Sequence, residues 1–117
     1  MKKAFKPAEI SELFVEYINS GNLEGVVSLF EDNAMVITGP ENTFAQGKNE
    51  IRDYFSHMLS HNPQFDTVHH RQPIINGDIA LTSSRVPNAF VTVEVSRKQP
   101  DGSWLWFIDQ PNITPEN

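Results

Sequence analysis

Two residues with carboxyl side chains lie in predicted strands, where the side chains can be buried. Glu94 is flanked by two valines in the run 90–96, whose apolar and polar residues alternate with period two, as is typical of a β-strand. Asp109 ends the tryptophan-containing run 104–109. Burial raises the pKa of a carboxyl and suits it to proton transfer at neutral pH. We therefore take both as candidate catalytic residues; the alternative is that the polar face of run 90–96 lies in water.

The face on which Asp109 lies is open from the sequence. In a regular strand Asp109 is opposite in phase to Trp104 and Trp106, because side chains alternate between the two faces. A carboxylate at the strand end, in water, is the alternative to a residue that faces the interior. If Glu94 and Asp109 do share one interior, they perturb each other and titrate at different pH values.

Three basic residues, His69, His70 and Arg71, follow one another in a predicted strand. One histidine then faces the interior and the other faces outward. Either could be the acid or base in a site with Glu94, and we take His69 as the third candidate catalytic residue. Arg71 shares the face of His69 and is a candidate to pair with Asp109 or Glu94, an arrangement that could bind a substrate carboxylate. Exposed histidines and a structural ion pair are the alternatives.

The sequence points to no metal and no cofactor. His57 and His61 have the spacing by which one helix face can hold a metal, but no third ligand accompanies them. Cysteine is absent, which excludes disulfides, thiolate zinc sites and a cysteine nucleophile. We also find no glycine-rich phosphate loop and no nucleophile elbow.

Length and composition predict one globular domain. The chain has 117 residues, 38% of them hydrophobic, which is ordinary for a single domain. We expect an ordered core over about residues 5–110 and a loose tail over 111–117. The formal net charge of −6 disfavours a nucleic-acid partner. No long apolar run or signal pattern is present, so we expect no membrane segment and a cytoplasmic location.

Helical spacing of apolar residues predicts three helices that position these groups. The first begins at Pro7 and stops at Gly21, the second is capped by Asn22 and extends to Phe30, and the third follows Gly47 and is closed by residues 61–63.

Strands are predicted over the rest of the chain, with turns at Asn76-Gly77 (type I′), Val86-Pro87-Asn88 and 99–102. The predicted strands span 34–38, 64–75 with a break near Pro73, 78–85, 90–96 and 104–109, and 41–46 is a loop or a brief return strand. This order indicates an α+β fold in which helices cover one face of a curved antiparallel sheet. Such a cone has an apolar interior and a mouth, which is typical of a small-molecule site.

Several segments resemble one family. The family is the NTF2-like, or SnoaL-like, superfamily, which includes ketosteroid isomerases. Its opening helix pair resembles the run 17–34, and its third helix resembles the run Gly47-Lys48-Asn49-Glu50-Ile51-Arg52. Its last hairpin is similar to the run 97–104 followed by Ile108-Asp109-Gln110. The resemblance implies an NTF2-like (cystatin-like) cone of order α-α-β-α-β-β-β, a homodimer, and a cavity-lining Asp109. The superfamily hosts both enzymes and non-catalytic association domains.

The resemblance also implies what this chain lacks. Ketosteroid isomerases use a general-base Asp and an oxyanion hole of a Tyr and a protonated Asp. The matching positions here hold Thr38, Phe14 and Ser96, which cannot perform these roles. We therefore predict that the protein is not an efficient steroid isomerase.

Two functions remain from the sequence. The first is a cofactor-free isomerase, cyclase or dehydratase acting on a small apolar molecule. Its binding pocket would be lined by Phe14, Tyr17, Met35, Tyr54, Arg71, Thr92, Ser96 and Trp106. The second is a non-catalytic association or ligand-carrier domain that works through dimerisation.

Overall fold

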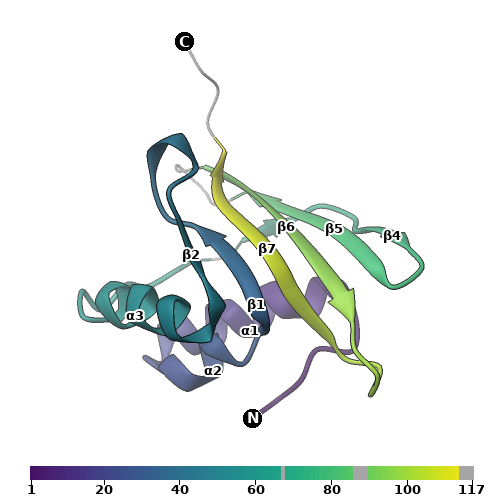
Figure 1. The fold of residues 1–117 in the computed structure, drawn as a ribbon, viewed down its shortest axis with the longest axis horizontal. Coiled ribbons are helices and arrows are strands. Elements are labelled where there is room, and N and C mark those ends of the chain that lie inside the picture. Colours follow the sequence, from purple (N-terminus) through teal and green to yellow (C-terminus); the bar gives the residue numbers. More distant parts are fainter. Residues whose placement is uncertain (67, 86–89, 114–117) are drawn as a thin grey trace.

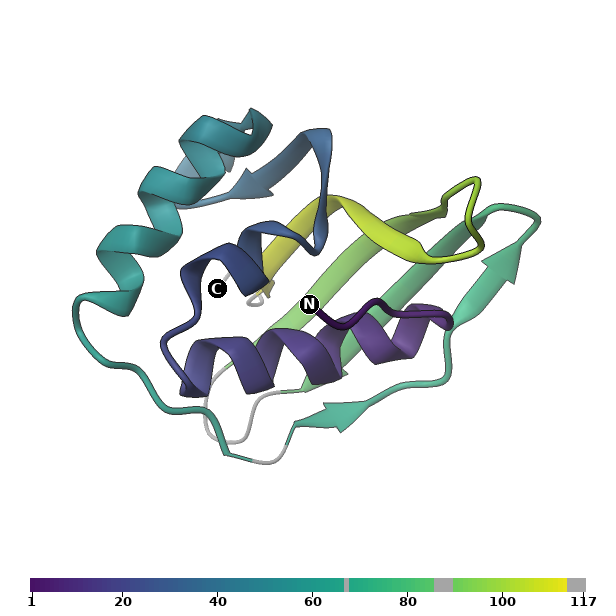
Figure 2. The same cartoon turned by 90° about the horizontal axis from the view of Figure 1, so that it is seen from below.

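The computed structural model describes residues 1–66, 68–85 and 90–113, and within them the predicted α+β fold is confirmed. Three α-helices lie on one side of a curved sheet (Figure 1), and the view from below shows α1, α2 and α3 grouped on that side (Figure 2). Along the chain the elements are α1 (Pro7–Asn19), α2 (Leu23–Val27), β1 (Phe30–Ile37), the 3₁₀ turn η1 (Pro40–Asn42), β2 (Phe44–Gln46), α3 (Gly47–Leu59), β3 (His69–His70), β4 (Ile74–Asn76), β5 (Ile79–Arg85), β6 (Val91–Lys98) and β7 (Trp104–Ile113).

The first two helices pack as a tight hairpin. Pro7 occupies the first turn of α1, where its missing N–H costs nothing, and the Asn22 side chain accepts a hydrogen bond from the Gly25 N–H to cap α2. Gly25 lies against the ring of Tyr17, so close that a Cβ there would stand 2.6 Å from Tyr17 Cδ1. None of the helices in the described part of the chain is long and apolar enough to span a membrane.

The sheet has the strand order β2-β1-β7-β6-β5-β3, and β4 pairs with β5. All neighbours are antiparallel except β1 and β7, which run parallel. The last strand therefore lies between β6 and the first strand, and it brings the C-terminal residues of the described chain into the middle of the sheet. Of the two alternatives for 41–46, a loop or a brief return strand, the structure has a return strand, β2.

Element boundaries differ from the sequence predictions in four places. The second helix ends at Val27 rather than Phe30, because the chain enters β1 directly. The strand predicted over 64–75 is reduced to β3 and β4. The β4–β5 hairpin forms, but its linking residues are Gly77 and Asp78; only Gly77 has positive φ, so the turn is not type I′. Strand β7 continues to Ile113; the predicted turn at 86–88 and the rest of the tail lie outside the described residues.

One end of the cone is filled by aromatic packing. Ala80, Ser96, Trp106 and Phe30 are cross-strand neighbours on β5, β6, β7 and β1, and all are buried. The Phe30 ring lies 5.4 Å from Trp106 and 5.7 Å from Phe55 of α3, centroid to centroid. These aromatic contacts close this end of the sheet against the helices.

The next cross-strand sets differ in chemistry. Facing the helices, Thr82, Glu94, Asp109 and Val36 are successive partners across β5, β6, β7 and β1; we call these four the inner row. Facing away from the helices, Ile74, Leu81, Val95, Ile108 and Met35 are successive partners across β4, β5, β6, β7 and β1; we call these five the outer row.

An extra residue in β7 decides the face on which Asp109 lies. Ser96 pairs with Trp106, yet Val95 pairs with Ile108, so Phe107 is an additional residue on the β7 side. A bulge of this kind changes the alternation of side chains beyond it. Asp109 therefore shares the inner face with Trp106, although a regular strand would place the two on opposite faces.

Candidate functional site

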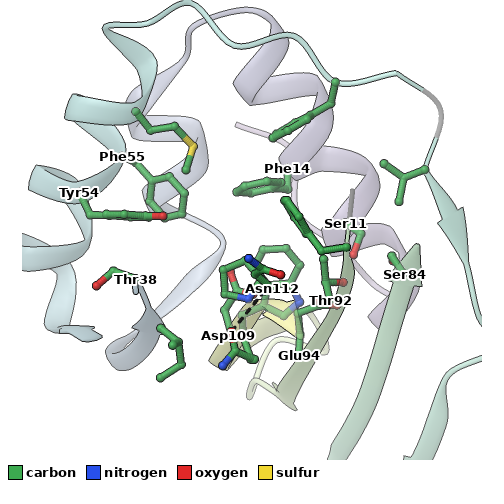
Figure 3. A pocket seen from close by; sticks show the side chains of 18 of the residues that line it. Ser11, Phe14, Thr38, Tyr54, Phe55, Ser84, Thr92, Glu94, Asp109 and Asn112 are labelled. Atoms are coloured by element: carbon green, nitrogen blue, oxygen red, sulfur yellow. Dashed lines mark hydrogen bonds between the residues drawn. The ribbon is translucent and has the colours of Figure 1, made fainter. Parts of the chain in front are cut away.

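A cavity of about 530 Å³ lies between the inner face of the sheet and helices α1 and α3 (Figure 3). It is lined by residues of α1, β1, α3, β5, β6 and β7 and by Phe65 and Val68. Its volume falls within the roughly 300–1,000 Å³ of small-molecule sites. Among the described lining residues Glu94 and Asp109 are the only acids, and none is a lysine, arginine or histidine.

A second hollow of the same volume lies between residues 1–4 and the β6–β7 turn. Its charged residues are exposed: Lys3 and Asp101 form an ion pair at 2.6 Å on the surface. That pair and hydrogen bonds from Ser103 hold the pKa of Asp101 well below its usual range, so this carboxyl has no proton to exchange near neutral pH. The cavity with Glu94 and Asp109 is the better candidate for chemistry.

Glu94 is a buried carboxyl with hydrogen-bond donors. It is 3% exposed, and the Thr82 hydroxyl donates to its Oε1 at 2.9 Å. Burial raises the pKa of Glu94, while the hydrogen bonds from Thr92 and Thr82 act in the opposite direction. The carboxyl is thereby made more basic than an exposed glutamate, and its anion still has donors.

Asp109 is the partner of Glu94 on the neighbouring strand and has a different environment. It is 4% exposed. Burial, and then the charge of Glu94, raise the pKa of Asp109 well above its usual range. Within the described part of the chain no hydrogen-bond donor offsets these effects. Asp109 therefore keeps its proton over a wider pH range than Glu94 and presents a neutral acid to the cavity.

Tyr54 supplies a second neutral donor. Its side chain reaches the cavity from α3, near Thr38 at the end of β1 (Figure 3). Burial and the nearby Asp109 raise the pKa of the phenol, so its O–H remains protonated. Tyr54 and Asp109 can both donate hydrogen bonds to a ligand oxygen.

Aromatic rings form a large part of the cavity wall. The ring of Phe14 lies 5.4 Å from Trp106, 5.7 Å from Phe55 and 6.3 Å from Phe65, centroid to centroid, and is stacked with the last. The Tyr54 ring continues this wall at 5.0 Å from Phe55. Such a wall favours a flat, apolar ligand.

Together these groups can move a proton. Two carboxyls whose pKa values differ give one site a base and an acid, and the pair titrates in two steps. Glu94 is suited to accept a proton, while Asp109 and Tyr54 are suited to stabilise negative charge that develops on a ligand oxygen.

The structure brings together six of the eleven residues predicted for the site. Lining the same cavity are Phe14, Tyr54, Thr92, Glu94, Trp106 and Asp109. Phe14 and Thr38, which match isomerase positions, also reach it, so an aromatic ring and a hydroxyl stand there.

His69 and Arg71 do not belong to this set, contrary to the sequence prediction. Both are exposed. Strand β3 contains only two residues and pairs with Ser84 and Arg85 at the end of β5. Neither the His69 nor the Arg71 side chain lines the cavity that contains Glu94 and Asp109.

Tyr17, Met35 and Ser96 also lie outside the cavity. The Tyr17 hydroxyl bonds to the backbone of Lys2, accepting from its N–H at 3.1 Å. Met35 belongs to the outer row. Ser96 faces inward as predicted, but at the aromatic closed end, where its hydroxyl is buried without a partner in the described residues.

Other lining residues were missed, notably Ser11 of α1 and Ser84 of β5. Ser11 precedes Phe14 and Val15 by three and four residues, so helical spacing puts all three on one face. Ser84 continues the period-two set Ala80 and Thr82. Both signals were present, but small polar residues do not contribute to a hydrophobic pattern.

The two histidines of α3 form no metal site in the structure. The rings of His57 and His61 lie 5.1 Å apart, centroid to centroid, and both side chains are exposed. Among residues 1–66, 68–85 and 90–113 no three potential ligands cluster.

Comparison with known proteins gives a family and a fold. The family model of the SnoaL-like domain matches residues 12–109. A ketosteroid isomerase-like protein from Erwinia carotovora atroseptica is similar in structure, with a TM-score of 0.73, 20% identity and coverage of 92% of this chain and 94% of that one.

Other solved structures agree. A protein described as a calcium/calmodulin-dependent protein kinase type II association domain, from Thiobacillus denitrificans, has a TM-score of 0.77 and 15% identity, covering 97% of this chain and 100% of that one. A protein of unknown function with a cystatin-like fold, from Nostoc punctiforme, has a TM-score of 0.70 and 21% identity, covering 93% and 89%. At these identities the likeness concerns the fold. No curated protein matches the chain.

Proposed function

The chain belongs to the SnoaL-like domain family, and from that premise we propose that it binds a small, largely apolar organic molecule and transfers a proton on it without a cofactor. The reaction is of the isomerase, cyclase or dehydratase kind. The observation that carries the proposal is the buried pair Glu94 and Asp109, direct cross-strand neighbours on the cavity lining with unequal hydrogen bonding.

The proposed step is a proton shift next to a carbonyl. Glu94 takes a proton from the carbon beside the carbonyl, the electron pair of that C–H bond forms a C=C bond to the carbonyl carbon, and the π pair of the C=O bond moves onto the oxygen. The O–H groups of Asp109 and Tyr54 hydrogen-bond to this oxygen as its charge grows. Glu94 then returns the proton to another carbon that is conjugated with the enolate, the electrons move back from the oxygen, the C=O bond forms again and Glu94 is regenerated as the base. A positioned base of this kind contributes about 10²–10⁴ in rate.

Ligand binding is tested first by thermal unfolding of the purified protein. The panel contains steroids, polyketide-like aromatics, terpenoids and small carboxylates. A ligand that binds only the folded state adds about 2.7 kcal/mol at a hundredfold excess over its dissociation constant. We expect a rise in Tm with neutral aromatic or carbonyl compounds and none with small carboxylates, because the described lining residues include no cation to offset Glu94.

Proton transfer is tested by exchange of the ligand's acidic C–H with deuterium, followed by NMR. We expect Glu94→Gln to slow exchange at least a hundredfold while the ligand still binds. The control is Glu31→Gln, which changes a glutamate on β1 outside the cavity. Exchange that is equally fast in Glu94→Gln and wild type would exclude Glu94 as the base.

A second candidate function is association through the outer face of the sheet; the Thiobacillus denitrificans protein is itself described as an association domain. The outer row supports it: Ile74 is 65% exposed and Leu81 42% exposed, and neighbouring exposed apolar side chains favour burial against a partner. The partner we propose is a second copy of this chain, which gives a homodimer.

Sedimentation analysis of Leu81→Lys/Ile108→Lys tests the homodimer. We expect wild type to sediment as a dimer and the double variant as a folded monomer, because two charges per protomer would have to be buried at the interface. Wild type that remains monomeric at high micromolar concentration would refute the association.

A further inference from the structure

The cavity has a second polar end, away from the carboxyl pair. Ser84 of β5 pairs with Thr92 of β6, and α1, which carries Ser11, contacts β5. Figure 3 shows these three residues on one side of the cavity, opposite Tyr54 and Thr38. We call Ser11 and Ser84 the serine end.

Ser84 is hydrogen-bonded to an exposed residue of the neighbouring strand, His70 of β3. Ser84 itself is 4% exposed, and its Oγ is hydrogen-bonded to Nδ1 of His70 at 2.9 Å. A hydroxyl has one donor and two acceptor sites. Whichever tautomer His70 adopts, the bond uses one of these sites, so Ser84 keeps hydrogen-bonding capacity on its cavity side. His70 is thus a positioning residue for Ser84.

Ser11 presents its hydroxyl to the cavity. The residue is 9% exposed and lines the cavity, and within the described residues its hydroxyl has no hydrogen-bond partner. This oxygen is not one of the fully buried polar atoms, so it is accessible from the cavity. A ligand oxygen or a water molecule there can form a hydrogen bond with it.

The serine end is separated from the carboxyl pair along the sheet. Ser84 is the partner of Thr92, and Glu94 stands two residues further along β6, which corresponds to about 7 Å of strand. The aromatic wall of Phe14 and Trp106 lines the same cavity. The space therefore suits a rigid, flat ligand of two fused rings with a polar group at each end.

We propose that the serine end is a subsite for a neutral hydroxyl group, so that the ligand class is a two-ended aromatic or alicyclic compound with one oxygen at Glu94 and Asp109 and a second at Ser11 and Ser84. This inference rests on the proposed function, since it assigns the far end of the same ligand. A hydroxyl suits the site because it both donates and accepts. A carboxylate does not, because no described lining residue carries a positive charge.

The test compares 2-naphthol with 2,6-dihydroxynaphthalene by isothermal titration calorimetry. We expect wild type to bind the diol about tenfold more tightly, the gain from one additional hydrogen bond. Ser11→Ala and Ser84→Ala should each reduce this preference and leave the affinity for 2-naphthol unchanged. Ser11→Ala sits on a helix that tolerates alanine, so it remains informative if Ser84→Ala is unstable.

The matched control is Ser83→Ala. Ser83 is the next residue on β5, lies outside the cavity lining and donates to the Thr92 carbonyl at 2.8 Å, so the preference for the diol should survive its loss. Equal affinity of wild type for the two naphthols, including no binding of either, overturns the subsite. Deuterium exchange that is equally fast in Glu94→Gln and wild type, with the serine effects on binding retained, instead counts against the proposed function and leaves the subsite in place.

Discussion

The inner and outer rows of the sheet reverse the arrangement that a half-buried sheet normally has. In the inner row Thr82, Glu94 and Asp109 are polar and buried; in the outer row Leu81 and Ile108 are apolar and 42% and 39% exposed. Most antiparallel sheets bury the apolar face and expose the polar one. Polar groups inside and apolar groups outside both reduce the stability of the isolated chain, so each row is understood best through what binds to it.

The two rows differ in how they respond to charge. In the inner row each new charge is desolvated and lies close to two carboxyls. In the outer row a charge is hydrated as long as no partner covers it. Substitutions at matched positions of the two rows can therefore separate the two environments.

The sharpest pair is Val36→Asp against Met35→Asp, adjacent residues of β1 in opposite rows. Val36 is fully buried beside Asp109, so Val36→Asp should cost about 3–5 kcal/mol, the penalty of an uncompensated buried charge. Met35→Asp should cost less than about 1 kcal/mol in the monomer while opposing self-association. Urea unfolding at low protein concentration measures both; similar costs for the two would remove the distinction between the rows.

A smaller effect is expected from pH. The pKa of Asp109 is raised by burial and by Glu94, so above about pH 4, the ordinary pKa of aspartate, the unfolded chain loses this proton while the folded chain keeps it. Stability from this group is thus complete at low pH and lost as pH rises towards the folded pKa. Asp109→Asn removes this loss.

Thermal unfolding of wild type and Asp109→Asn at pH 4, 6 and 8 checks this sign. We expect nearly equal Tm values at pH 4 and a growing advantage of Asp109→Asn at pH 6 and 8. Glu94, whose pKa is also raised by burial, acts in the same direction in both proteins. A Tm difference that is constant with pH would show that Asp109 ionises freely in the folded chain.

The smallest effect is expected on the solvent side of the sheet, at Arg97. Its Nε lies 3.2 Å from Oε2 of Glu31, as an ion pair without hydrogen-bond geometry, and its guanidinium lies 4.5 Å from the Phe107 ring centroid. Because the Arg97 side chain is 42% exposed, Arg97→Gln should cost about 0.5–1 kcal/mol. Urea unfolding in low and high salt tests this: the cost should shrink with salt, and a loss above 2 kcal/mol would contradict it.

Period-two patterning predicted much of the inner face. Thr92, Glu94 and Ser96 were expected on one side of their strand, and they lie on one side. The pattern could not say how far along the cone each one lies. Ser96 is at the end filled by Trp106 and Phe30, a matter of packing between distant segments.

Local patterning failed where the strand itself is short. His69 and Arg71 were placed by alternation in a strand over 64–75, but among the described residues of that range and its continuation the strands are His69–His70 and Ile74–Asn76. Alternation does apply to the two histidines of β3, since His70 pairs with the inward-facing Ser84 and His69 pairs with Arg85, but the sequence did not determine which of the two faces inward. Arg71 lies beyond the end of this strand. The hydrogen bond between His70 and Ser84 likewise depends on the pairing of β3 with β5.

Because of the extra residue at Phe107, the candidate site depends on the number of residues in β7 as well as on their chemistry. Register along a strand works like a reading frame: removing one residue before Asp109 would exchange the inward and outward sets of everything after it. The carboxyl would then point to solvent with every side chain of the chain otherwise retained. Two relatives with the same acid in the last strand can therefore differ in chemistry through a single insertion, and the length of that segment identifies which of them keeps the acid inside.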